Sequence, residues 1–231
     1  MSQHSILLLH GALGSEAQFN SLKKQLADSF DVHSFSFEGH GGRPSNRPFL
    51  IENCVENVLE YMDAHQLDSV SIFGYSMGGY VALLLAGMHP NRVDRIMTLG
   101  TKFAWSSEFA EREVKKLNPD KIEEKVPKFA QFLEGVHTPL DWKDVVRDTA
   151  DMMIDLGENR PLDKYVSTIS TQTLITLGSL DNMSTEEESR AVSENLANGK
   201  FQLIPDVEHP IEKVNPAELA QEIEQFMSTD S

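Results

Sequence analysis

The stretch Gly74-Tyr75-Ser76-Met77-Gly78-Gly79 lies between the apolar run Val70 to Phe73 and the apolar, helix-like run Tyr80 to Met88. A serine with a glycine two residues away on each side, set between a strand and a helix, is typical of a nucleophile elbow. The glycines are needed because side chains at their positions would collide where the strand and the helix come close together. The stretch therefore predicts a strand, a sharp turn and a helix, with Ser76 as a candidate nucleophile.

Strand-like and helix-like segments alternate on both sides of this elbow. Parallel strands need crossover connections of a dozen or more residues, and these are usually helices. The alternation predicts the α/β class, with a mostly parallel sheet of about six strands and helices on both faces. Ligands of such sheets bind beyond the carboxyl ends of the strands. The strand-like runs are Ser5 to Leu9, Val32 to Phe37, Val70 to Phe73, Val93 to Leu99, Thr173 to Leu177 and Phe201 to Ile204.

The alternation stops between about residues 101 and 170. This segment has no convincing strand and holds charged helical stretches at Glu108 to Leu117, Ile122 to Glu134 and Trp142 to Leu156. Its apolar residues are too many for a solvated tether. We expect a single domain over residues 1–231 that carries a helical insertion at about 101–170.

Aromatic residues of the insertion are candidates for the wall of a substrate pocket. Phe129 and Leu133 have helical spacing, which favours packing of the insertion onto the core over contact with substrate. Phe103 and Trp105 lie just after a strand end, which favours the pocket. The candidate pocket residues are Leu13, Phe103, Trp105, Phe129 and Trp142.

A serine hydroxyl needs a base before it can act as a nucleophile. His209 follows the last strand-like run and is the only histidine after His137, so it belongs at the same edge of the sheet as Ser76. A carboxylate must then hold the imidazole in the correct tautomer. Asp181, just after the strand ending at Leu177, is placed for that role. The alternatives are a turn or helix-capping role for Asp181 and a loop role for His209.

With these motifs the sequence resembles the α/β-hydrolase superfamily over nearly its whole length, from Ile6 to Met227. The resemblance implies that Ser76 is the nucleophile, Asp181 the acid and His209 the base of a catalytic triad. It implies an oxyanion hole made by the backbone N–H groups of Ala12 and Met77. It also implies that the helical insertion is a lid.

The sequence departs from the family pattern beside the candidate base. Val207 and Glu208 stand where the family often has glycine, and an inward-pointing Glu208 carboxylate would raise the pKa of His209. Relatives that open epoxides or remove halogens use an aspartate nucleophile, so Ser76 argues against those chemistries. We also expect a shortened sheet, because the chain begins at the strand before His10.

The resemblance implies a serine hydrolase that acts on an ester or thioester of a small to medium acyl group through an acyl-enzyme. A carbon–carbon bond hydrolase or lyase with the same triad is an alternative, and so is an acyltransferase. A non-catalytic, ligand-binding member of the fold is a further alternative, from a different class of protein. The sequence fixes neither the substrate nor the oligomeric state.

Charge and residue content limit the binding partners and cofactors that the sequence predicts. The 36 acidic and 20 basic residues give a formal net charge of -16, which would repel nucleic acid and anionic membranes. No apolar run approaches the length of a membrane span. The histidines show no metal-ligand spacing, so we expect no metal and no cofactor. The single cysteine, Cys54, fits a core position and a cytoplasmic location. The expected partner is a small molecule with an apolar acyl part.

Overall fold

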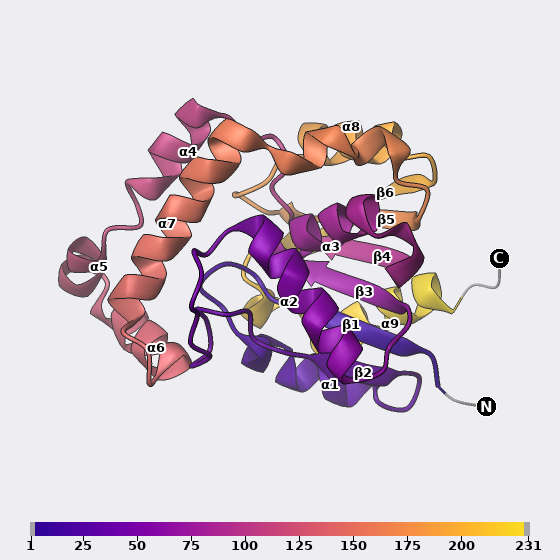
Figure 1. Cartoon of the computed structure of the whole chain (residues 1–231), viewed down its shortest axis with the longest axis horizontal. Coiled ribbons are helices and arrows are strands. Elements are labelled where there is room, and N and C mark those ends of the chain that lie inside the picture. The colour runs from indigo at the N-terminus through magenta and orange to yellow at the C-terminus, as the bar shows by residue number, and fades with distance from the viewer. Residues whose placement is uncertain (1–2, 229–231) are drawn as a thin grey trace.

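The computed structural model describes residues 3–228 and joins the six predicted strands in one parallel sheet, in the order β2-β1-β3-β4-β5-β6 (Figure 1). The predicted fold class is therefore confirmed. The strand ends lie level with one another: Leu9 pairs with Gly74, and Tyr75 with Leu99. The loops that follow these strands consequently share one edge of the sheet. The strands are β1 (Ser5–Leu9), β2 (Asp31–Ser34), β3 (Val70–Tyr75), β4 (Val93–Leu99), β5 (Gln172–Leu180) and β6 (Gly199–Glu208).

Helices cover both faces of the sheet (Figure 1). Side chains of a strand alternate between its two faces, so both sets of β1 side chains are buried. Ile6 and Leu8 pack with α1 and α9, whereas Leu7 and Leu9 pack with α2 and α3. This explains why β1 is a continuous apolar run. The helices are α1 (Asn20–Leu26), α2 (Ile51–Ala64), α3 (Met77–Met88), α8 (Glu186–Asn195) and α9 (Pro216–Met227).

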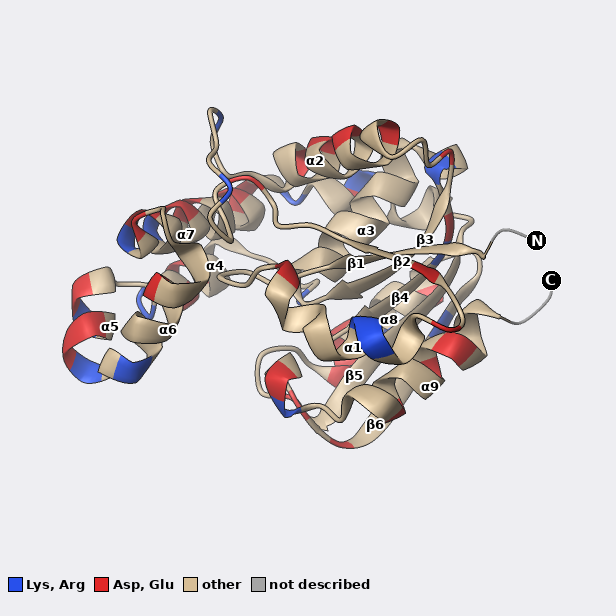
Figure 2. Cartoon of the chain, turned by 90° about the horizontal axis from the view of Figure 1, so that it is seen from below, with Lys and Arg blue, Asp and Glu red and all other residues tan. Residues whose placement is uncertain are grey.

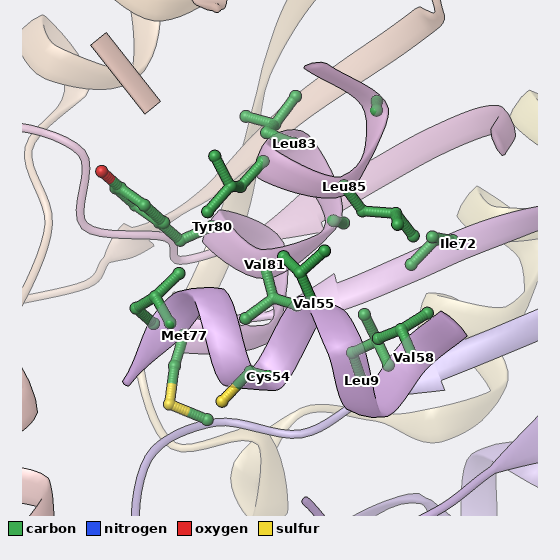
Figure 3. Close-up of a cluster of buried hydrophobic side chains, with 14 of the residues drawn as sticks. Leu9, Cys54, Val55, Val58, Ile72, Met77, Tyr80, Val81, Leu83 and Leu85 are labelled. Carbon is green, nitrogen blue, oxygen red and sulfur yellow. The ribbon is translucent and has the colours of Figure 1, made fainter. Parts of the chain in front are cut away.

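Helix α3 lies at the centre of the larger core cluster. It is apolar on all sides, as expected of a helix that is buried all round, and every residue from Met77 to Ala86 is buried. Figure 3 shows Val55 of α2 beside Val81 of α3, and Val58 of α2 beside Leu9 of β1. Cys54 belongs to the same cluster. Cys54 is thus a small core residue, and burial raises the pKa of its thiol.

The segment between β4 and β5 forms four α-helices, and these lie beyond one end of the sheet (Figure 1). These are α4 (Ser107–Val114), α5 (Pro119–Lys125), α6 (Pro127–His137) and α7 (Trp142–Asn159). A single helix was expected from Ile122 to Glu134. Two form instead, because Pro127 has no N–H to continue α5 and begins α6.

The segment between β4 and β5, residues 101–170, which we call the insertion, packs against the rest of the chain through two apolar clusters. Met152 and Leu156 of α7 join the core cluster that contains α3. Leu133 of α6 and Trp142 of α7 belong to a smaller cluster, against which Leu13 packs.

The expected packing of Phe129 onto the core is wrong. Ala130, Leu133 and His137 form the buried face of α6 at helical spacing, and the neighbouring positions Phe129 and Phe132 lie beside that face. Their rings stack on each other, and they are 40% and 44% exposed.

Acidic residues recur along α2, α5 and α7 (Figure 2). No helix among residues 3–228 combines the length and apolarity needed to span a bilayer.

Candidate active site

Ser76 lies at the turn between β3 and α3 and has an unusual backbone conformation, with φ 51° and ψ −117°. Such a conformation persists only where the surroundings hold it. The Ser76 N–H donates to the carbonyl oxygen of Leu99 at 2.8 Å, and the Thr101 hydroxyl donates to the Ser76 carbonyl oxygen at 2.9 Å. Residues at the end of β4 therefore hold the elbow in place.

Two glycines allow the backbone to come close to the elbow. A Cβ atom on Gly74 would lie 2.5 Å from the Gly79 nitrogen, so the strand and the helix could not meet at this angle with a larger residue. A Cβ atom on Gly11 would lie 3.3 Å from the Ser76 Cβ and 2.8 Å from the Tyr75 ring. The loop after β1 thus reaches the candidate nucleophile.

His209 directly follows β6, and Asp181 directly follows β5. The His209 Nδ1–H donates to Asp181 Oδ2 at 2.7 Å. The other carboxylate oxygen of Asp181 accepts the backbone N–H groups of Met183 at 2.7 Å and Ser184 at 3.0 Å. Because Nδ1 carries the proton in this arrangement, Nε2 of the neutral ring has a free lone pair.

The environment keeps Asp181 ionised. Burial by itself would raise the pKa of this carboxyl, whose side chain is 2% exposed. The hydrogen bond and charge of His209, with the amides of Ser184 and Met183, outweigh burial and lower the pKa of Asp181 below its usual value. A carboxylate that stays ionised can stabilise a positive charge on His209.

Neighbours fix the position of His209. The Tyr75 hydroxyl donates to the His209 carbonyl oxygen at 3.1 Å, and the two rings lie 5.5 Å apart between centroids. Glu208 points away from the site, because its carboxylate binds the Lys213 ammonium at 2.6 Å and its side chain is half exposed.

Ser76 and His209 line the same cavity, together with Ala12 and Met77. Met77 is the first residue of α3, so its N–H has no partner within the helix. Donors at such a position suit a developing negative charge. The apolar part of the wall comes from Ile51, Tyr80, Trp105, Phe109, Leu117, Met152, Met153, Leu156 and Met183.

A family model described as the alpha/beta hydrolase fold matches residues 4–138, which is more than half of the chain. The chain belongs to this family. The resemblance found in the sequence is therefore confirmed.

Curated relatives of this α/β hydrolase match part of it. A probable alcohol acetyltransferase of Wickerhamomyces anomalus is 36% identical over 39% of this chain and 27% of its own length. A pimeloyl-[acyl-carrier protein] methyl ester esterase of Neisseria meningitidis is 34% identical over 43% of this chain and 36% of its own length. The chain thus spans about a third of the length of these relatives.

Solved structures match the fold over the whole chain. The enol-lactonase of Burkholderia xenovorans superposes with a TM-score of 0.81, covering 99% of this chain and 93% of that chain at 18% identity. This likeness extends the fold match past residue 138, to β5, β6 and α9.

The structure of this α/β hydrolase distributes the candidate pocket residues unevenly. Trp105 lines the cavity. Phe103 is buried in the main core, Leu13 and Trp142 lie in the smaller cluster, and Phe129 is exposed on α6. None of these four lines the cavity. The phase of α6 leaves Phe129 exposed, and the phase of α7 turns Trp142 toward the smaller cluster.

Some residues of the site were not singled out from the sequence. One side of α7 lines the cavity with Met152, Met153 and Leu156. Their helical spacing in the sequence could have predicted an apolar face that lines a pocket. Thr101, which holds the Ser76 carbonyl, had no such signal. Among residues 3–228, no group of three or more histidine, cysteine or acidic side chains is arranged to hold a metal ion.

Buried histidines support the loops around the cavity. The ring of His10 is fully buried, with Nε2 accepting the Phe37 N–H at 3.0 Å and Nδ1–H donating to the Gly11 carbonyl oxygen at 2.8 Å. Burial lowers the pKa of His10 from 6.5 to about 4. His40, on the next loop, is also buried, and desolvation lowers its pKa well below the usual value. Both rings are therefore neutral near pH 7.

We expect acid to destabilise the protein through these rings. As pH falls below 6.5, the unfolded chain binds a proton at His10 before the folded chain does, so unfolding becomes more favourable. His10 alone should lower the free energy of unfolding by roughly 2 kcal/mol between pH 7 and pH 5. Urea unfolding at the two pH values measures this loss.

The variant His10→Asn tests the assignment. It should be less stable at pH 7 but lose less on acidification, whereas the control Val58→Ala, which shortens a buried side chain without a titratable group, should keep the wild-type pH dependence. An unchanged pH dependence in His10→Asn would contradict the account.

Proposed function

We propose that this α/β hydrolase is a serine esterase that cleaves esters or thioesters of small to medium, apolar acyl groups. The observation that carries the proposal is the 2.7 Å hydrogen bond between His209 and Asp181 beside a cavity that Ser76 also lines. A serine, a histidine with a free Nε2 and an ionised carboxylate are the three groups that acyl transfer to serine requires.

In the proposed reaction, Ser76 Oγ attacks the carbonyl carbon while His209 Nε2 takes its proton. The oxygen of the tetrahedral intermediate accepts the backbone N–H groups of Ala12 and Met77. His209 then gives the proton to the leaving alcohol or thiol, and an acyl-Ser76 ester remains. Water attacks this ester with His209 again as general base, which releases the acid and restores Ser76.

The cavity wall supports an apolar acyl group. Trp105 and Phe109 from the start of the insertion, with Met153 from α7, line the cavity together with Ile51 and Tyr80 of the main core. Because the insertion supplies so much of the wall, we propose that it acts as the lid of the site. A substrate that fills the cavity with methylene groups would leave no polar group of its own unpaired there.

The names of the relatives support two reactions of esters, hydrolysis and acyl transfer to an alcohol. The relative from N. meningitidis is named as a methyl ester esterase, which supports hydrolysis. The relative from W. anomalus is named as a probable alcohol acetyltransferase, which favours transfer of the acyl group to an alcohol as a second candidate function. The two differ only in the acceptor of the acyl group. Turnover in the presence of ethanol would yield an ethyl ester if transfer dominates and a free acid if hydrolysis does.

The location of the proposed activity follows from a single residue. Cys54 is the only cysteine and is buried, so the proposed enzyme needs no oxidising compartment. We propose a cytoplasmic location on this ground.

A series of p-nitrophenyl esters from acetate to dodecanoate tests the acyl preference. Each methylene buried in the cavity contributes about 0.8 kcal/mol, so kcat/KM should rise about fourfold per methylene until the cavity is full. The substitution Met153→Trp places a larger side chain in the cavity. It should lower kcat/KM for the octanoate ester at least tenfold, while kcat/KM for the acetate ester changes little.

The matched control Met153→Leu, which keeps the volume, should retain the wild-type profile. A flat profile in the wild type would contradict an apolar acyl pocket. Failure to cleave any ester in the series would favour the carbon–carbon bond hydrolase, lyase or ligand-binding alternatives.

A further inference from the structure

The loop that carries Ala12 is a tight turn. The Gly14 N–H donates to the Gly11 carbonyl oxygen at 3.1 Å, and Leu13 has a positive φ of 58°. A leucine in this region is strained, so contacts from outside the turn must hold it. Both polar backbone groups of Leu13 have such contacts. Its N–H donates to His40 Nε2 at 3.3 Å, and its carbonyl oxygen accepts from His137 Nε2–H at 3.2 Å.

His137 comes from the insertion. It is the last residue of α6, and its side chain is fully buried although most of that helix faces solvent. Its Nδ1 accepts the Gly41 N–H at 3.1 Å, which leaves the proton on Nε2 for the Leu13 carbonyl. A single ring thus joins the insertion, the loop after β2 and the turn at Leu13.

The bond from His137 reaches the oxyanion hole through two peptide units. The Leu13 carbonyl and the Gly14 N–H belong to one planar peptide, and the Gly11 carbonyl and the Ala12 N–H belong to another. Because the two groups of a trans peptide point in opposite directions, fixing the Gly11 carbonyl fixes the direction of the Ala12 N–H. Hydrogen bonds that are linked in series also polarise one another, so the bond from His137 should make the Ala12 N–H a stronger donor.

We propose that His137 is a positioning residue for the reaction, which orients the Ala12 N–H toward the developing oxyanion from within the insertion. This role rests on the proposed function. Under this proposal, the oxyanion hole is complete only while His137 of α6 contacts the turn at Leu13. Sequence position gives no hint of it, since His137 lies 125 residues after Ala12.

Two variants separate the two nitrogens of the ring. An asparagine amide replaces Nδ1 and can still accept the Gly41 N–H, whereas a glutamine amide replaces Nε2 and can still donate to the Leu13 carbonyl. We expect His137→Asn and His137→Leu to lower kcat by about 10- to 100-fold with KM nearly unchanged. His137→Gln should recover most of the lost rate. The control Val146→Ala loosens the apolar cluster of α6 and α7, against which Leu13 packs, but it removes no hydrogen bond of the turn, and it should keep kcat close to wild type.

A pair of inhibitors measures the oxyanion hole directly. A trifluoromethyl alkyl ketone adds Ser76 Oγ to its carbonyl carbon and forms an oxyanion, whereas the methyl ketone of the same chain binds without this step. The ratio of the two affinities should fall in His137→Asn and His137→Leu by the same factor as kcat, and it should hold in His137→Gln and Val146→Ala. If the leucine variant does not fold, the asparagine and glutamine pair decides.

If the wild type cleaves esters and His137→Asn has the same affinity ratio as the wild type, the role of His137 alone would be overturned. An equal fall of the ratio in Val146→Ala would also overturn it, because lid packing would then be the cause. A wild type that neither turns over esters nor binds the trifluoromethyl ketone more tightly than the methyl ketone would overturn the proposed function and this role together.

Discussion

Replacing Ser76 with alanine should lower kcat for the best ester by about 10⁵- to 10⁶-fold, because the proposed acyl-enzyme forms on the Ser76 hydroxyl. The cavity itself would be intact, so binding of the methyl ketone should change little. Alanine keeps the Cβ atom. The hydrogen bonds that join Ser76 to Leu99 and Thr101 use the backbone N–H and carbonyl oxygen of Ser76, not its hydroxyl. The free energy of unfolding should therefore stay close to that of the wild type.

A second serine of the same cavity provides the control. Ser184 also lines the cavity, and its hydroxyl donates to the Gly100 carbonyl oxygen at 3.2 Å. Ser184→Ala loses a hydrogen bond near Asp181 but no reacting atom, so kcat should fall far less than in Ser76→Ala. A Ser76→Ala enzyme that retains a tenth of the wild-type rate would remove Ser76 from the proposed mechanism.

The substitution Asp181→Asn should lower kcat by about 10⁴-fold. Two backbone N–H groups, those of Met183 and Ser184, donate to one carboxylate oxygen, so the amide oxygen of asparagine must take that position. Its NH₂ group would then face His209 Nδ1 and force the proton onto Nε2. A histidine with a protonated Nε2 cannot accept the Ser76 proton.

An unfolding measurement distinguishes this cause from a simple loss of structure. Asp181→Asn should keep a cooperative unfolding transition near that of the wild type while its rate stays low at neutral pH. The control Asp206→Asn removes a nearby exposed charge, at a positive φ that asparagine tolerates, and should leave kcat unchanged. A loss of less than tenfold in Asp181→Asn would contradict its role as the acid of the triad.

The fold and the candidate triad were predictable because their signals are local. The elbow, the apolar runs and the position of each polar residue just after a strand can all be read within short windows of sequence. Parallel pairing then brings those strand ends to one edge, so Ser76, Asp181 and His209 could be expected together without knowledge of their contacts.

The wall of the cavity was less predictable because it depends on how helices of the insertion dock. Phe129 and Trp142 have the composition expected of a pocket, yet the rotation of α6 leaves Phe129 in solvent and that of α7 turns Trp142 into a separate cluster. The break at Pro127 could have been read from the sequence, since proline ends a preceding helix. The contact between His137 and Leu13 could not, because no local pattern joins residues so far apart in the chain.

Labelling of the purified protein with a fluorophosphonate, followed by mapping of the modified residue, tests the central claim most directly. The account predicts rapid modification at Ser76 that is lost in His209→Ala, because the hydroxyl reacts only while the ring takes its proton. Modification at another residue would contradict it, and so would equal labelling of Ser76 with and without His209.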